Sequence, residues 1–211
     1  MYNKKMMGLL VIVMALSCAS SGISRNRLPL NGRKALLIIA PTNFRDEEYS
    51  NTRKELEKAG LKVTVASTTT KPATGMLGMR TTPDITIADV RVNDYDLIAM
   101  PGGSGVRVFY KNQAVKDILR QAYKLGKVVG AICLAPVVLA KAGLLKGKKA
   151  TSWRGAKQTL KNMGVNVINH HVVTDGHVVT GDGPRAAHAF GKRLVELLER
   201  RLKNHQKEGK K

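Results

Sequence analysis

The stretch Val128-Val129-Gly130-Ala131-Ile132-Cys133-Leu134-Ala135-Pro136-Val137-Val138-Leu139 decides the fold. An apolar, largely β-branched run ends at Cys133, and helix-forming residues follow. Pro136 lies in the first turn of that helix, where a missing N–H costs nothing. The order predicts a strand, a sharp turn and a helix, with the cysteine at the turn. Esterases place a serine in the same geometry, which needs small residues two positions before and after it. Ala131 and Ala135 meet that need.

Two interpretations of Cys133 follow from this stretch. The helix N-terminus beside the sulfur favours thiolate over thiol, which predicts a nucleophile with a lowered pKa. A buried structural cysteine fits the same stretch equally well, because free cysteine is among the most buried residue types.

The rest of the chain alternates between strand and helix patterns. Strands are expected at 35–40, 61–66, 96–100, 127–132 and 150–153, and helices at 47–59, 112–125, 136–142, 155–163 and 184–203. Residues 72–92 indicate an irregular hairpin excursion, and 172–180 a hairpin that turns at Asp175-Gly176. Repeated strand–helix units predict a mostly parallel sheet with helices on both faces.

Ligands of such sheets bind at the carboxyl ends of the strands. Three chemically informative stretches fall at such ends, namely 41–48, 101–105 and Cys133. We therefore expect them to meet at one site.

The chain is strongly basic, with 36 Lys and Arg against 15 Asp and Glu and a formal net charge of +21. Such a charge attracts polyanions. No nucleic-acid motif is present and aromatic residues make up only 4%, so nucleic acid is a poor candidate. An anionic membrane surface or an acidic polysaccharide is the better candidate partner for an exported protein, and a generally basic proteome is the plainest explanation.

The N-terminal residues indicate export. Lys4 and Lys5 precede the apolar run 8–16, which is too short to span a bilayer, and small residues surround Cys18. Residues 1–17 therefore predict a bacterial signal peptide of the lipoprotein type, with lipidation at Cys18 and a periplasmic or membrane-anchored location. Ordinary cleavage near Ala19 is the alternative.

The predicted organisation is a basic tether at 18–33, one domain at 34–203, and a basic disordered tail at 204–211. With one of the two cysteines in the signal region, no internal disulfide can form in the mature chain.

The chain resembles the ThiJ/PfpI superfamily, which includes the parkinsonism-associated protein deglycase. Each of the matching segments is weak alone, but their order and spacing are specific: Ala131-Ile132-Cys133, Met100-Pro101-Gly102-Gly103, the run from Ala142 to Ser152, and the run from Ala59 to Ala66. The resemblance implies a flavodoxin-like, Rossmann-like three-layer α/β sandwich of the class I glutamine amidotransferase type. It also implies a nucleophile elbow at Cys133.

The resemblance further implies an acidic partner for the cysteine, twelve residues before the glycine that ends the first helix. Counting back from Gly60 gives Glu48, with Glu47 as its neighbour. A protonated carboxyl donates a hydrogen bond to a thiolate, and an ionised one takes the thiol proton. The plain alternative is that Asp46, Glu47 and Glu48 only favour a helix N-terminus.

An oxyanion hole is expected from two backbone N–H groups. Leu134, the residue after the nucleophile, supplies one. Gly103 supplies the other, because glycine lets the backbone approach closely. A plain turn at Gly102-Gly103 is the alternative.

Two departures from the family pattern concern histidine. Protease-like members carry histidine directly after the cysteine, where this chain has Leu134. Other members carry it after Thr-Ser on a later strand, where this chain has Trp153. A Cys–His peptidase is therefore disfavoured, and Trp153 is a weak candidate for the pocket wall. No metal site is expected from His170, His171 and His177, because alternation points His170 and His171 to opposite faces.

The resemblance implies a cofactor-free stress-response enzyme of the glyoxalase III or deglycase type, a lyase or hydrolase acting on small reactive aldehydes or glycated adducts. The family is usually homodimeric. The alternative is a non-catalytic redox sensor or chaperone in which Cys133 oxidises beside Glu48. A peptidase or amidase comes third.

Overall fold

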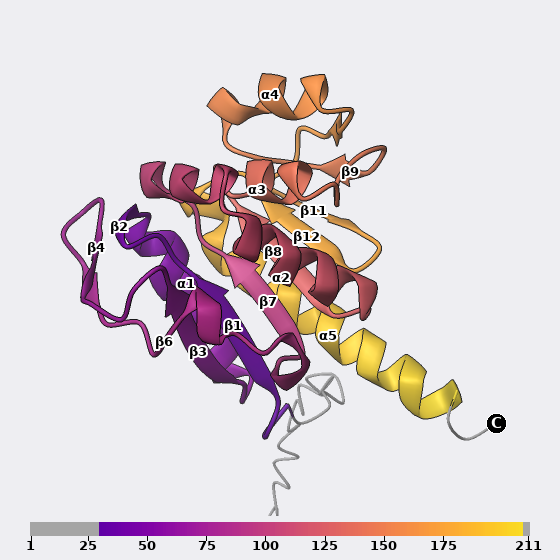
Figure 1. The fold of residues 1–211 in the computed structure, drawn as a ribbon. Coiled ribbons are helices and arrows are strands. Elements are labelled where there is room, and N and C mark those ends of the chain that lie inside the picture. The colour runs from indigo at the N-terminus through magenta and orange to yellow at the C-terminus, as the bar shows by residue number, and fades with distance from the viewer. Residues whose placement is uncertain (1–29, 209–211) are drawn as a thin grey trace, which may run out of the picture.

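A seven-stranded sheet forms the middle layer of the computed structural model, which describes residues 30–208 (Figure 1). Every neighbouring pair in it is parallel except β11 and β12. In spatial order the strands are β11 (Val172–Asp175), β12 (Val178–Gly181), β8 (Val128–Ile132), β7 (Leu97–Met100), β1 (Lys34–Ile38), β3 (Lys62–Ser67) and β6 (Ile85–Thr86).

Helices cover both faces of this sheet (Figure 1). One face packs against α1 (Asp46–Lys58) and α5 (Ala187–Glu208), and the other against α2 (Gln113–Lys124) and α3 (Pro136–Lys141). The short helices are α4 (Lys157–Asn162), η1 (Ile87–Asp89), η2 (Val92–Asp94), η3 (Ser104–Tyr110), η4 (Arg154–Ala156) and η5 (Pro184–Ala186). Two small sheets complete the fold, one of β2 (Thr42–Phe44), β4 (Ala73–Gly75) and β5 (Arg80–Thr81), the other of β9 (Lys149–Ala150) and β10 (Asn166–Val167).

The central strands β7 and β8, and β1 after Lys34, are apolar because both of their faces are buried. Along β1, Leu36 and Ile38 belong to the core on the α2 and α3 side, whereas Ala35 and Leu37 belong to the core on the α1 and α5 side. Successive strand residues point to opposite faces, so a strand buried on both sides cannot alternate apolar with polar residues. The predicted three-layer α/β fold is confirmed.

Gly130 lets α5 approach β8 closely. A Cβ atom at this position would lie 2.7 Å from Leu194 Cδ2 and 2.9 Å from Phe190 Cζ. A side chain on this strand position would therefore push α5 away from the sheet.

The predicted strand at 150–153 is shorter in the structure, where β9 ends at Ala150. The Thr151 N–H donates to the Thr180 hydroxyl, and the Trp153 N–H donates to the Cys133 carbonyl at 2.9 Å. Neither bond belongs to the pairing of β9 with β10. The chain therefore leaves the strand after Ala150, and Trp153 lies beside the turn that carries Cys133.

Both predicted boundaries of the folded domain are corrected. Leu30, assigned to the tether at 18–33, is fully buried in the core. Helix α5 continues to Glu208, so the first part of the predicted disordered tail at 204–211 is helical.

The predicted signal peptide at 1–17 and Cys18 lie outside the described residues. Within residues 30–208 no helix is both long and apolar enough to cross a membrane.

Candidate active site

Cys133 stands on a strained turn between β8 and α3. Its φ of 66° lies in the left-handed region, which non-glycine residues adopt mainly where the surroundings enforce it. Its N–H still donates to the Gly181 carbonyl of β12 at 2.9 Å, and only 7% of the residue is exposed. Ala131 and Ala135 are fully buried on either side. The turn therefore holds the sulfur at the carboxyl end of the sheet.

Glu48 lies in the first turn of α1 and is fully buried. Its Oε2 accepts a hydrogen bond of 2.8 Å from the Gly102 N–H, whereas its Oε1 is buried without a hydrogen-bond partner that meets ordinary geometry. The neighbouring acids have other contacts. Glu47 pairs with Arg45 at 2.8 Å, and Asp46 accepts the N–H groups of Leu77 and Met79, thereby holding the turn between β4 and β5.

The turn after β7 joins Glu48 to Cys133. The Gly102 N–H binds the Glu48 carboxylate, and the next N–H, that of Gly103, donates to the Cys133 sulfur and lowers its pKa. The Leu134 N–H also donates to the sulfur and lowers the pKa of Cys133. A Cβ at Gly102 would lie 2.7 Å from Cys133 Cβ and 3.0 Å from Glu48 Oε2, so only glycine leaves room there. The structure thus brings together the four residues expected at the catalytic centre.

The electrostatics of the pair differ from the sequence expectation. Burial raises the pKa of Glu48 from 4.5 to about 7. Burial, and then the Glu48 charge, raise the pKa of the Cys133 thiol from 9.0 to about 12, so the expected lowering is wrong for a thiol beside an ionised Glu48. Near neutral pH the pair carries at most one negative charge. A proton can therefore be shared between the Cys133 sulfur and the Glu48 carboxylate, whose hydrogen bond lowers the pKa of Glu48.

Gly103 offers a test of the turn geometry. Its φ is 95°, and a Cβ there would lie 2.5 Å from the Arg45 nitrogen and closer still to the Asn43 carbonyl. Gly103→Ala should therefore lower the free energy of unfolding by about 1–3 kcal/mol more than the cost of placing alanine at a left-handed φ. Gly78→Ala is the matched control, because its φ is 93° and a Cβ added there would have nothing within 4 Å. Urea unfolding of both variants measures the difference, and equal losses would contradict the close approach at Gly103.

The raised pKa of Glu48 predicts a pH-dependent stability. Because folding disfavours the carboxylate, wild-type stability should fall as the pH rises from 4.5 through about 7. Glu48→Gln does not ionise, so it should match the wild type near pH 4 and exceed it near pH 8 by up to about 3 kcal/mol. Urea unfolding at the two pH values checks this, with Glu47→Gln as the control. If the difference in unfolding free energy between Glu48→Gln and the wild type is the same at both pH values, the pKa of Glu48 is not raised by folding.

A cavity of about 210 Å³ opens onto the sulfur. Trp153, the weak candidate of the sequence analysis, lines it with 40% of its surface exposed. Arg45 and Met76 also line it and were not expected from the sequence. Arg45 precedes α1 and Met76 lies between β4 and β5, so only the tertiary fold brings them to the cysteine.

Neither His171 nor His177 lines this cavity. His171 Nδ1 contacts Asp182 at 2.8 Å, and His177 Nε2 contacts the Tyr123 carbonyl at 3.1 Å. Among residues 30–208 no group of three or more His, Cys, Asp or Glu side chains is arranged to hold a metal ion.

Comparison with known proteins places this site in a family. The model of the DJ-1/PfpI family matches residues 33–197. The chain belongs to the DJ-1/PfpI family. An uncharacterized protein of Methanocaldococcus jannaschii is 39% identical over 201 residues, with 93% of this chain and 98% of the relative covered. Deglycase PfpI of Pyrococcus furiosus is 32% identical, with 78% and 99% covered.

Two further comparisons support the family's fold and chemistry. A protein of Caenorhabditis elegans called a glutathione-independent glyoxalase is 30% identical, with 79% of this chain and 89% of the relative covered. The crystal structure of a ThiJ/PfpI domain protein from Brachyspira murdochii superposes with a TM-score of 0.77 at 27% identity, covering 80% of this chain and 97% of that one.

The relatives correct the predicted localisation. The sequence relatives of this chain include DJ-1/PfpI proteins of archaea and animals, and these do not support a bacterial envelope lipoprotein. The predictions of a signal peptide, of lipidation at Cys18 and of a periplasmic location are therefore wrong. An anionic membrane surface or an acidic polysaccharide was expected as a partner only because export was expected, so this expectation is withdrawn as well.

Proposed function

We propose that this protein is a cysteine-dependent enzyme that converts 2-oxoaldehydes such as methylglyoxal, or their adducts, into hydroxyacids. The observation that carries the proposal is the juxtaposition of Cys133 and Glu48, each bound by one of two successive N–H groups, those of Gly103 and Gly102. The deglycase and glyoxalase names of the relatives support the same class of chemistry.

In the first step, Glu48 acts as the base. A general base is most effective when its pKa lies near the working pH, and burial raises the pKa of Glu48 to about 7. The carboxylate takes the thiol proton while the sulfur attacks the aldehyde carbon, and the aldehyde C=O becomes an oxyanion. The N–H groups of Gly103 and Leu134, which converge on the sulfur, stabilise that oxygen. The protonated Glu48 then gives its proton to the oxygen, which forms the hemithioacetal and restores the carboxylate.

In the second step, Glu48 moves a proton between adjacent carbons. The carboxylate removes the C–H proton of the hemithioacetal carbon and returns it to the neighbouring ketone carbon. The hemithioacetal hydroxyl proton moves to the former ketone oxygen, giving a 2-hydroxyacyl thioester on Cys133. Water then attacks the thioester, which releases the hydroxyacid and restores the thiol. The net reaction adds one water to the 2-oxoaldehyde, so it needs no external oxidant or reductant.

Product analysis tests the function. Purified protein incubated with methylglyoxal should form lactate, the D form in our proposal, with one lactate for each methylglyoxal consumed over many turnovers. Consumption that stops at one equivalent per chain would contradict the enzyme and favour the redox-sensor interpretation. Hydrolysis of a peptide panel in the absence of methylglyoxal turnover would favour the peptidase interpretation.

Self-association is a separate expectation drawn from the family. We propose a homodimer in solution. Sedimentation velocity at several concentrations measures the mass, and a monomer throughout would contradict it.

A further inference from the structure

A second and larger cavity adjoins the one that contains Cys133. Its volume is about 480 Å³, and it shares Trp153 and Pro184 with the smaller cavity. Pockets that hold small molecules commonly enclose about 300–1,000 Å³, so the larger cavity falls in that range and the smaller one below it. A ligand that passes Trp153 can therefore occupy both.

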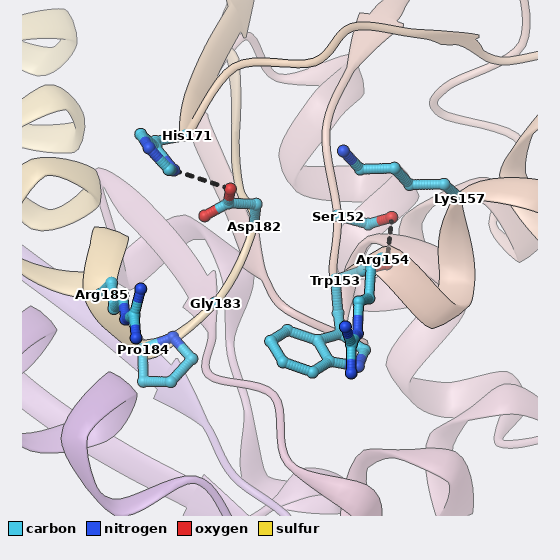
Figure 2. A pocket seen from close by; sticks show the side chains of 9 residues that line it. All are labelled: Ser152, Trp153, Arg154, Lys157, His171, Asp182, Gly183, Pro184 and Arg185. Atoms are coloured by element: carbon cyan, nitrogen blue, oxygen red, sulfur yellow. Dashed lines mark hydrogen bonds and ion pairs between the residues drawn. The ribbon is translucent and has the colours of Figure 1, made fainter.

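The larger cavity is lined by cations without acidic partners. Arg154, Lys157 and Arg185 line it, and Figure 2 shows their side chains around the opening beside Trp153. Asp182 is the one acid in the lining, and it already contacts His171 at 2.8 Å. We call this cavity, defined by Arg154, Lys157, His171, Asp182 and Arg185, the cationic cavity.

None of the three permanent cations is neutralised by a carboxylate of residues 30–208. Lys157 Nζ donates to the neutral Asn169 Oδ1 at 2.8 Å, and the Arg154 guanidinium lies 5.6 Å from the Trp153 ring centroid. The Arg185 side chain makes no hydrogen bond or ion pair to any described residue. The cavity therefore has positive charge and free N–H donors on its walls, and guanidinium groups bind carboxylate and phosphate oxygens in pairs.

We propose that the cationic cavity binds an oxyanion of the substrate, a phosphate or a carboxylate, while the reactive carbonyl group of the same molecule reaches Cys133. The proposal rests on the proposed function and adds a substrate class to it, namely 2-oxoaldehydes or adducts that carry an anionic group. A neutral 2-oxoaldehyde such as methylglyoxal fills only the smaller cavity and makes no use of the three cations.

Anion binding can be measured without turnover, because Trp153 is the only tryptophan of the chain and belongs to the walls of both cavities. Inorganic phosphate and, separately, acetate are titrated into the full-length protein at constant ionic strength made up with chloride, and tryptophan fluorescence is followed. A saturable change is expected with at least one of them. The double variant Lys157→Gln/Arg185→Gln should weaken that binding about 5-fold or more.

Lys62→Gln is the matched control for the loss of positive charge. Lys62 is exposed at the beginning of β3, and Cys133 follows the end of β8. The two therefore lie at opposite ends of the parallel strands, Lys62 at the amino ends and Cys133 at the carboxyl ends. This variant should bind phosphate and acetate as the wild type does. An equal loss in Lys62→Gln would show a general charge effect and overturn the proposal, as would the absence of saturable binding of either anion.

Turnover provides the second measurement. We compare kcat/KM for two pairs of 2-oxoaldehydes, each with one anionic and one neutral member. The pair that tests a carboxylate is 4,5-dioxopentanoate and its methyl ester. The pair that tests a phosphate is 3-phosphooxy-2-oxopropanal and 3-hydroxy-2-oxopropanal. The wild type should prefer the anionic member of at least one pair, and the double variant should reduce that ratio about 5-fold. The pair that responds identifies the anion.

The experiments distinguish a failure of the proposed function from a failure of the cationic cavity proposal. If methylglyoxal is turned over but neither anionic preference nor anion binding is found, the cationic cavity proposal fails and the proposed function stands. If phosphate or acetate binds and the double variant abolishes that binding while no 2-oxoaldehyde is turned over, the proposed function fails and the anion site stands.

Discussion

Cys133→Ala should lower lactate formation from methylglyoxal by at least about 1,000-fold, because the reaction proceeds through a covalent bond to the sulfur. Alanine keeps the Cβ atom, so the strained turn at φ 66° is unchanged and only a sulfur that is nearly buried is removed. Lactate is measured under single-turnover and steady-state conditions.

The control for Cys133→Ala is the other cysteine. The chain contains two cysteines, so Cys18→Ser should leave turnover unchanged. Circular dichroism and urea unfolding show whether Cys133→Ala folds. A folded Cys133→Ala protein whose rate stays within about 10-fold of the wild type would rule out the covalent route, since loss of a nucleophile costs far more than that.

Glu48→Gln should lower turnover by about 100-fold to 10,000-fold, the range typical of a lost general acid–base group. The glutamine carbonyl can still accept the Gly102 N–H, and its amide can face the position of the partnerless Oε1. The shape of the site is therefore kept, and only the movement of the proton is lost.

The same variant should make Cys133 more reactive toward iodoacetamide at neutral pH. The Glu48 charge is the second cause of the raised pKa of Cys133, so its removal favours the thiolate. Alkylation is measured in a Cys18→Ser background, so that Cys133 is the only thiol. Slower turnover together with faster alkylation separates a lost proton shuttle from a damaged site.

Glu47→Gln is the matched control for Glu48→Gln. Glu47 is adjacent in sequence, but its carboxylate pairs with Arg45 at 2.8 Å rather than binding Gly102. It should retain nearly full turnover. If Glu47→Gln is the damaging change, Glu47 is the acid; if both variants keep full rate, the proton moves by another route.

The parts of the site that lie within one continuous segment could be predicted from the sequence. The strand, turn and helix around Cys133 follow from local composition. Glu47 and Glu48 both lie in the first turn of α1, and Gly60 marks the end of that helix. The spacing alone does not show which acid is buried. That depends on which side of α1 faces the end of β8, and the contact that reveals it is between Glu48 and Gly102.

The pKa of Cys133 could not be predicted from the sequence. The expectation from a helix N-terminus omitted two larger effects, the burial of the thiol and the charge of Glu48. Both arise from residues far away in the chain. Likewise, Asp46 is an ordinary acidic residue of a first helical turn by sequence, and only the fold shows that it holds the backbone of Leu77 and Met79.

The sequence by itself determined the alternation of strands and helices, the tight turn at Cys133 and the glycines after β7, because these depend on interactions between residues close along the chain. The tertiary structure decided that Glu48 is buried against that turn, that burial raises the pKa of both Glu48 and Cys133, and that Trp153 separates the nucleophile from the cationic cavity. The physical reason is that desolvation and charge–charge interaction depend on distance in space, which a parallel sheet sets by bringing the carboxyl ends of strands distant in sequence to one edge.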